Sequence, residues 1–82
     1  MNRDAKQLVL TLLEHRARDA TLCPSEVARA LAADAGEPAI WRKHMPTVHD
    51  AIDQLQSEGR VRLSWKGRIL PRRHGPYRIR RA

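Results

Sequence analysis

The residues from Arg60 to Arg81 carry the side chains of this sequence that are best suited to a chemical task. The stretch RVRLSWKGRILPRRHGPYRIRR contains nine arginine or lysine residues and no aspartate or glutamate. Residues 1–59 hold seven basic and nine acidic side chains, so the formal net charge of +7 arises entirely from the C-terminal stretch. Guanidinium and ammonium groups at this density suit a polyanion, because they neutralise and hydrogen-bond phosphate groups. The charge distribution therefore predicts a polyanionic partner, with nucleic acid as the first candidate.

No residue pattern typical of an enzyme or a metal site accompanies these charges. The sequence contains no G-x-x-x-x-G-K-[ST], G-x-G-x-x-G, H-E-x-x-H or G-x-S-x-G motif. The four histidines, at positions 15, 44, 49 and 74, are scattered, and the lone Cys23 has no base at a recognisable spacing. We therefore expect no catalysis, no metal and no cofactor. A single cysteine also fits a reducing compartment, which predicts a cytoplasmic protein.

Three amphipathic helices are expected before the basic stretch. Apolar residues recur there at spacings of three and four, which predicts helices at residues 4–17, 24–34 and 46–58. Pro24 suits the first position of the second helix, and Glu26 could complete a capping box with Cys23. No run of about 18 apolar residues exists, so we expect no membrane contact.

After Gly59 the period of the apolar residues changes from about 3.6 to 2, which indicates β-strands. The alternating apolar positions are Val61, Leu63, Trp65, Tyr77 and Ile79. Lys66-Gly67 is a plausible two-residue turn, and the segment Thr-Leu-Cys at 21–23 could add a very short strand. We predict a folded β-ribbon over residues 60–80, called the wing below, with one apolar and one basic face.

The expected order of elements is that of an α+β winged helix-turn-helix. Three short helices cannot enclose a core alone at this size, so the apolar face of a two- or three-stranded wing is expected to close it. We predict one domain over residues 1–82. Trp65 falls on the apolar side of the wing and Trp41 at a helix junction, so we expect both to anchor the core rather than stack on a base.

Three segments resemble a small bacterial family of uncharacterised domains associated with a winged-helix fold. They are CPSEVARAL (23–31), WRKHMPTVHDAIDQLQSEGRV (41–61) and GPYRIR (75–80). This sequence departs from the pattern at His44 and in a longer loop at 38–40. The resemblance implies the architecture and carries no assigned activity.

The third helix is the element that a helix-turn-helix would place in the major groove. Its face opposite the apolar stripe is centred on Asp50, Asp53 and Ser57, and carboxylates there repel phosphate. The candidate base-contacting and backbone-holding residues at its N-terminal end are Thr47, His49, Arg42 and Lys43.

The wing is expected to supply most contacts with nucleic acid. Its candidate residues are Arg62, Lys66, Arg68, Arg72, Arg73, Arg78 and Arg80. Arginine outnumbers lysine, which favours bidentate contacts with phosphate or guanine. Some of these guanidinium groups could pair within the chain instead, with Asp50, Asp53 or Glu58. We expect two or three such pairs, for which Arg60 and Arg62 are the nearest candidates.

The leading hypothesis is a non-enzymatic module that binds nucleic acid, DNA more than RNA, mainly through the basic wing. The alternative is a protein-interaction module that presents the acidic helix face and the basic wing to a partner or to a second copy. Association with RNA or the ribosome, and a basic face that only aids solubility, remain open, as does the oligomeric state. Carboxylates of Asp50 and Asp53 on the same side as the wing arginines would disfavour the usual docking of the third helix in DNA.

Overall fold

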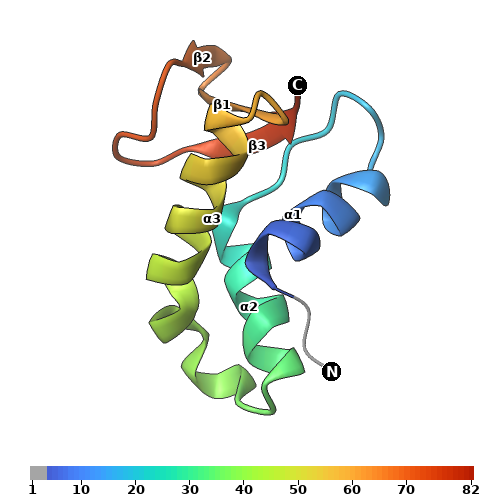
Figure 1. Cartoon of the computed structure of the whole chain (residues 1–82), viewed down its shortest axis with the longest axis vertical. Coiled ribbons are helices and arrows are strands. Elements are labelled where there is room, and N and C mark those ends of the chain that lie inside the picture. Colours follow the sequence, from blue (N-terminus) through green and yellow to red (C-terminus); the bar gives the residue numbers. More distant parts are fainter. Residues whose placement is uncertain (1–3) are drawn as a thin grey trace.

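The computed structural model describes residues 4–82 and shows three α-helices followed by a three-stranded antiparallel sheet (Figure 1). The helices are α1 (Ala5–Glu14), α2 (Pro24–Asp34) and α3 (Met45–Ser57), and a 3-10 helix, η1 (Pro38–His44), joins α2 to α3. The strands are β1 (Val61–Trp65), β2 (Arg68–Leu70) and β3 (Arg78–Arg81). This arrangement confirms the predicted α+β, winged-helix-like layout. Among the described residues no helix has both the length and the apolar content needed to cross a bilayer.

Helix α1 ends at Glu14, three residues before the predicted end. Its N-terminus is capped by Asp4, whose carboxylate accepts a hydrogen bond from the backbone N–H of Gln7 (2.8 Å). At the other end, the guanidinium group of Arg81 donates to the carbonyl oxygens of Leu13 (2.7 Å) and Arg16 (3.2 Å). A side chain from the last strand thus satisfies carbonyls that a longer helix would have used.

The capping box predicted for α2 is wrong. The Cys23 side chain makes no capping hydrogen bond and instead lies 3.0 Å from the hydroxyl of Ser25. The carboxylate of Glu26 accepts a hydrogen bond from Arg16 (2.7 Å) and so faces the α1–α2 loop. A thiol is a weak acceptor, and the guanidinium group is the stronger partner for this carboxylate.

Strand β1 is the central strand of the sheet, with β2 on one side and β3 on the other. Trp65 pairs with Arg68 across a two-residue turn, and both turn residues have positive φ, 51° for Lys66 and 80° for Gly67. These values fit a type I′ hairpin and confirm the predicted Lys66-Gly67 turn. The predicted short strand is present as a single bridge in which Leu22 and Ile79 exchange two backbone hydrogen bonds, of 2.7 and 2.8 Å.

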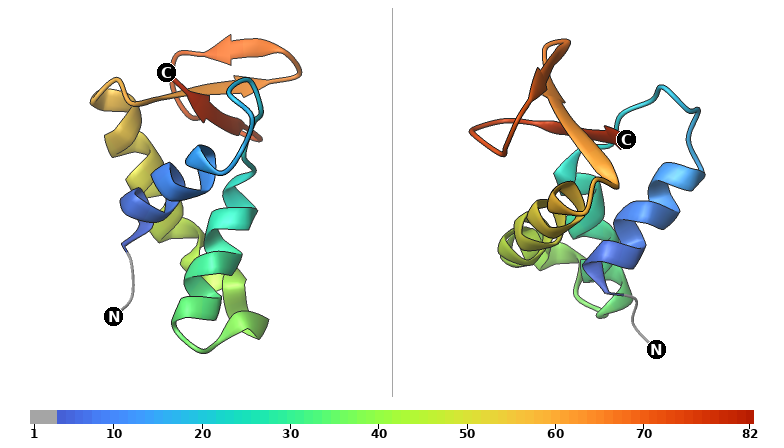
Figure 2. Two further views of the ribbon diagram at one scale, coloured as in Figure 1. Left: turned by 90° about the vertical axis from the view of Figure 1, so that its right-hand side faces the viewer. Right: turned by 45° about the horizontal axis from the view of Figure 1, so that its top comes forward.

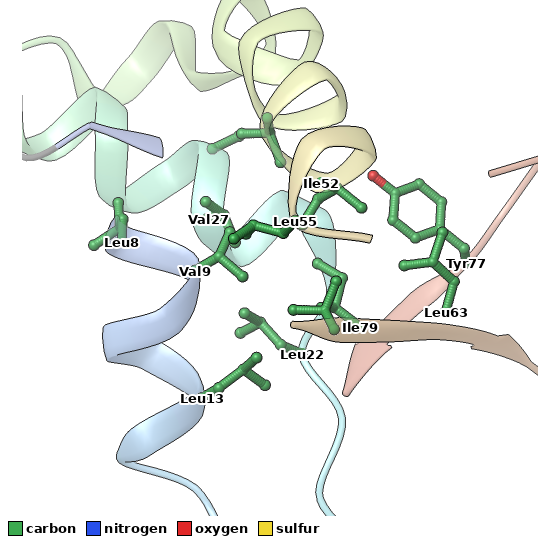
Figure 3. Packing of buried hydrophobic residues seen from close by; sticks show 13 residues of the cluster. Leu8, Val9, Leu13, Leu22, Val27, Ile52, Leu55, Leu63, Tyr77 and Ile79 are labelled. Carbon is green, nitrogen blue, oxygen red and sulfur yellow. The ribbon is translucent and has the colours of Figure 1, made fainter. Parts of the chain in front are cut away.

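The sheet lies across one end of the helices, and η1 lies at the other end (Figures 1 and 2). Side chains from all three helices meet the inner face of the sheet in one core (Figure 3). Its fully buried large members are Leu8, Val9, Leu22, Val27, Val48, Ile52, Leu55, Leu63 and Ile79. The sheet therefore closes a core that the helices alone would leave open, as the apolar alternation of the wing predicts.

The expected core role of Trp65 is wrong. Trp65 is 38% exposed, because it stands at the turn end of β1. Leu63, two residues earlier in the same strand, is fully buried in the core. Trp41 is half-buried and packs against the edge of the core. The guanidinium carbons of Arg29 and Arg42 each lie 4.5 Å from the centre of its ring. Cation–π contacts with two arginines give Trp41 a structural role at the junction of α2 and η1.

Candidate nucleic-acid interface

Three adjoining hollows connect the outer face of α3 to the α1–α2 loop. The first lies between α3 and the loop after β2, and its lining includes Asp53, Gln56, Pro71, Arg72 and Arg73. The second shares Gln56 and Pro71 with the first and adds Arg62 and Ile69. The third shares Arg62 with the second, and its other arginines are Arg18, Arg80 and Arg81. We use the name basic track for Arg18, Arg62, Arg72, Arg73 and Arg80.

The loop between β2 and β3, residues 71–77, is attached to α3 by side-chain hydrogen bonds. The guanidinium group of Arg73 holds the carboxylate of Asp53 with two hydrogen bonds, Nε–Oδ1 at 3.1 Å and Nη2–Oδ2 at 3.0 Å. The Gln56 amide donates to the carbonyl oxygen of Pro71 (2.9 Å). The loop is therefore positioned by polar contacts, and it carries Arg72 and Arg73 to the outer face of α3.

The pairing of Asp53 with Arg73 changes the electrostatics of this face. The hydrogen bonds from Arg73 lower the pKa of the Asp53 carboxyl, and the same contact raises the pKa of Arg73. Both groups are therefore charged at neutral pH, and one carboxylate of the acidic face is neutralised by a bidentate partner. Asp50 remains exposed without an ion pair within residues 4–82.

The two predicted base-contacting residues of α3 do not share a surface. His49 turns toward the loop, where its Nδ1 lies 2.7 Å from the Tyr77 hydroxyl. Burial is the main cause that lowers the pKa of His49, and the positive charge of Arg73 adds to it, so the ring is neutral at pH 7. Thr47 lies on the opposite flank of α3, beside Lys6 of α1. The structure therefore separates these two candidates.

Arg42 and Lys43 lie in η1, at the end of the molecule opposite the sheet (Figure 2). The Lys43 ammonium group pairs with Glu37 at 2.8 Å, and this contact lowers the pKa of Glu37. Arg42 lies over the Trp41 ring. The structure thus does not bring these two candidates to the same surface as the wing.

Some candidate residues of the wing are exposed, and others form hydrogen bonds or ion pairs within the described residues. Exposed side chains without an ion pair in the described part of the chain are Arg62, Lys66, Arg68 and Arg72. Arg78 is half-buried, and its Nε donates to the Thr21 hydroxyl at 2.6 Å. Arg80 lies 3.8 Å from the carboxylate of Asp19. Arg60, one of the expected intramolecular partners, lies 3.8 Å from Glu58, whereas Arg62 has no such pair within residues 4–82.

The sequence interpretation missed functional candidates in the hollows, among them Arg18, Gln56 and Arg81. Arg18 belongs to the α1–α2 loop, which the bridge between Leu22 and Ile79 attaches to the sheet. The apolar pattern of residues 21–23 was the only signal for that contact. Gln56 lies seven residues after His49 and therefore on the same flank of α3, so the helical period could have identified it.

The sequence matches the family described as "Protein of unknown function (DUF3253)" over residues 2–82. A search of curated proteins found no match. Because the match spans nearly the whole sequence, the chain belongs to this family.

Proposed function

We propose that this member of the DUF3253 family is a non-enzymatic winged-helix module that binds nucleic acid, DNA in preference to RNA, through its basic wing. The observation that carries the proposal is the set of exposed cations without an ion pair in residues 4–82, namely Arg62, Lys66, Arg68 and Arg72. Exposed guanidinium groups that have no internal partner are available to phosphate. The lone Cys23 supports a cytoplasmic location.

The proposed binding mode is led by the wing rather than by insertion of α3 into the major groove. Asp53 is bonded to Arg73, so an acidic side chain of α3 lies on the same side as a wing arginine. Asp50 is exposed on the outer face of the same helix. The Asp50 carboxylate disfavours the usual recognition-helix contact with phosphate-lined grooves, and Asp53 offers no free acceptor there because Arg73 occupies its carboxylate. The wing cations lie beside this face and would contact the backbone instead.

An amide-shift NMR titration with a random-sequence DNA duplex at about 50 and 200 mM salt tests this proposal. We expect shifts in residues 60–80 that decrease strongly at the higher salt, because each phosphate contact releases condensed counterions. The Arg62→Gln variant should bind more weakly than wild type, whereas Arg29→Gln, which removes an equal charge from α2 near η1, should bind like wild type. Absence of shifts at both salt concentrations would rule out the proposal.

A protein-interaction role is the second candidate, and the exposure of Ile69 favours it. Ile69 is 54% exposed on β2, an edge strand with an unpaired side. Edge strands of this kind can pair with another chain. If DNA gives no shifts, sedimentation equilibrium should reveal self-association that the Ile69→Lys variant abolishes. A monomeric wild type would argue against pairing with a second copy through this edge.

A further inference from the structure

We infer that the third of the three hollows is a discrete pocket for one phosphate group. Its arginines are Arg18, Arg62, Arg80 and Arg81. It lies between the α1–α2 loop and the end of the sheet where β1 begins and β3 ends. Its volume is about 240 Å³, which leaves room for a tetrahedral oxyanion with several water molecules of about 30 Å³ each. This inference rests on the proposed function for the source of the phosphate, the backbone of a nucleic acid.

The register of the sheet places two of these arginines directly opposite each other. Arg62 of β1 pairs with Arg80 of β3, while their neighbour Leu63 pairs with Ile79 in the core. Since residues alternate between faces, Arg62 and Arg80 both lie on the outer face of the sheet. Like charges at directly opposite positions destabilise a sheet. An oxyanion between the two guanidinium groups would convert this repulsion into attraction.

The neighbouring groups leave this charge largely uncompensated. Arg78, on the same outer face, is engaged with Thr21, and Arg62 has no ion pair within residues 4–82. Among the described residues, the acidic partner of Arg80 is Asp19, at 3.8 Å, and the Asp19 side chain is 94% exposed. An exposed pair at this distance contributes little stability. Arg80 is therefore free to exchange its partner for a stronger one.

The charge balance and the donor geometry both point to phosphate. Among the residues that line the hollow, Asp19 supplies the one carboxylate side chain, against four guanidinium groups. Arg81 uses its Nη2 on carbonyl oxygens of the α1 end, which fixes its side chain at the edge of the hollow. Planar guanidinium groups donate in pairs to phosphate oxygens, which lysine cannot do.

Titration of the intact protein with inorganic phosphate, at constant ionic strength set by sodium chloride, tests the pocket directly. The probes are the Nε–Hε signals of the arginines in two-dimensional NMR spectra. We expect saturable shifts for Arg62 and Arg80, and about tenfold weaker binding in Arg62→Gln and Arg80→Gln, as expected for loss of one charge-assisted hydrogen bond. Arg29→Gln should bind phosphate like wild type. Linear, non-saturating shifts, or equal affinity in all variants, would overturn the inference.

A second arm of the experiment separates the source of the phosphate from the existence of the pocket. If inorganic phosphate competes with a DNA duplex for the Arg62 and Arg80 signals, the pocket holds a backbone phosphate. If phosphate saturates the pocket but the duplex produces no shifts, the pocket takes a small phosphate compound and the proposed function fails alone. If the duplex shifts Lys66 and Arg68 while phosphate never saturates Arg62, the proposed function stands and the pocket is refuted.

Discussion

The hydrogen bond between His49 and Tyr77 joins α3 to the residue that precedes β3. The distance of 2.7 Å between Nδ1 and the hydroxyl oxygen is that of a well-formed bond, and Tyr77 is only 4% exposed. Burial raises the pKa of Tyr77, so its hydroxyl group stays protonated and can donate to a neutral imidazole. A side chain that the sequence suggests for contacts with bases is therefore used to hold the wing against the helix.

This contact predicts a stability that depends on pH through His49. Its pKa is lowered in the folded protein, so the unfolded chain binds more protons as the pH falls below the ordinary value of about 6.5. The free energy of unfolding should therefore decrease as the pH is lowered from 7 to 5. The negative charges of Asp50 and Asp53 oppose the lowering of the His49 pKa and so reduce this effect. Urea denaturation at each pH measures it.

The matched control for this prediction is His49→Gln, which keeps a polar group beside Tyr77 but does not titrate. The other three histidines are the same in both proteins, so the difference between the two pH profiles isolates His49. We expect a flatter profile for the variant over this range. Identical profiles would show that burial of His49 does not couple protonation to folding.

Loss of the ion pair between Asp53 and Arg73 should affect DNA binding more than the stability of the fold. The Arg73 and Asp53 side chains are 34% and 47% exposed, so loss of the pair should change the free energy of unfolding by less than about 1 kcal/mol. Asp53→Asn removes a negative charge beside the basic track and frees the Arg73 guanidinium group from its ion pair. Fluorescence anisotropy with a labelled duplex should show tighter binding for Asp53→Asn and weaker binding for Arg73→Gln. Weaker binding by Asp53→Asn would mean that the pair positions the loop for contact.

At the scale of the elements, the wing depends on the conformation of its turn. Gly67 has a φ of 80°, in a region where a side chain costs about 1–2 kcal/mol, and a Cβ there would meet no atom within 4 Å. Gly67→Ala should therefore destabilise the hairpin by about 1 kcal/mol through the backbone alone, with amide exchange rising mainly in β1 and β2. Hydrogen-exchange NMR measures this local effect.

Gly59→Ala is the control for that experiment. Gly59 also has a positive φ, 72°, and open space around its Cβ position, but it lies at the end of α3. It should cost a similar free energy without selectively opening the β1–β2 hairpin. Equal protection of the hairpin in wild type and Gly67→Ala would contradict the assignment of the turn as the element that fixes the wing.

The helices and strands could be predicted from the sequence where the spacing of neighbouring residues alone determines them. Alternation of apolar residues and the Lys66-Gly67 pair identified the strands and their turn, because both are short-range features. The end of α1 was not predictable, because Arg81, 68 residues after Leu13, satisfies its carbonyls. The exposure of Trp65 was not predictable either, because the alternation of apolar residues does not show that the buried part of β1 ends before its last residue.

At the scale of the whole molecule, the candidate interface occupies one end of a body that measures 35 × 24 × 21 Å. The sequence predicted the basic residues of the wing, because charge is read directly from composition. It could not predict that Arg18 joins them or that Arg42 and Lys43 lie at the opposite end (Figure 1). Those placements arise from the pairing of β1 with β3 and from the direction of α3, which are long-range properties of the fold.

This layout makes a quantitative prediction for the dependence of DNA affinity on salt. If the four unpaired wing cations and Arg80 each neutralise one phosphate, a plot of log affinity against log salt concentration should have a slope of about −4 to −5. Arg62→Gln and Arg72→Gln should each make the slope less negative by about 0.9. Arg29→Gln removes the same charge near η1 and should leave the slope unchanged. Equal changes in all three variants would show that net charge, rather than the location of the wing arginines, determines binding.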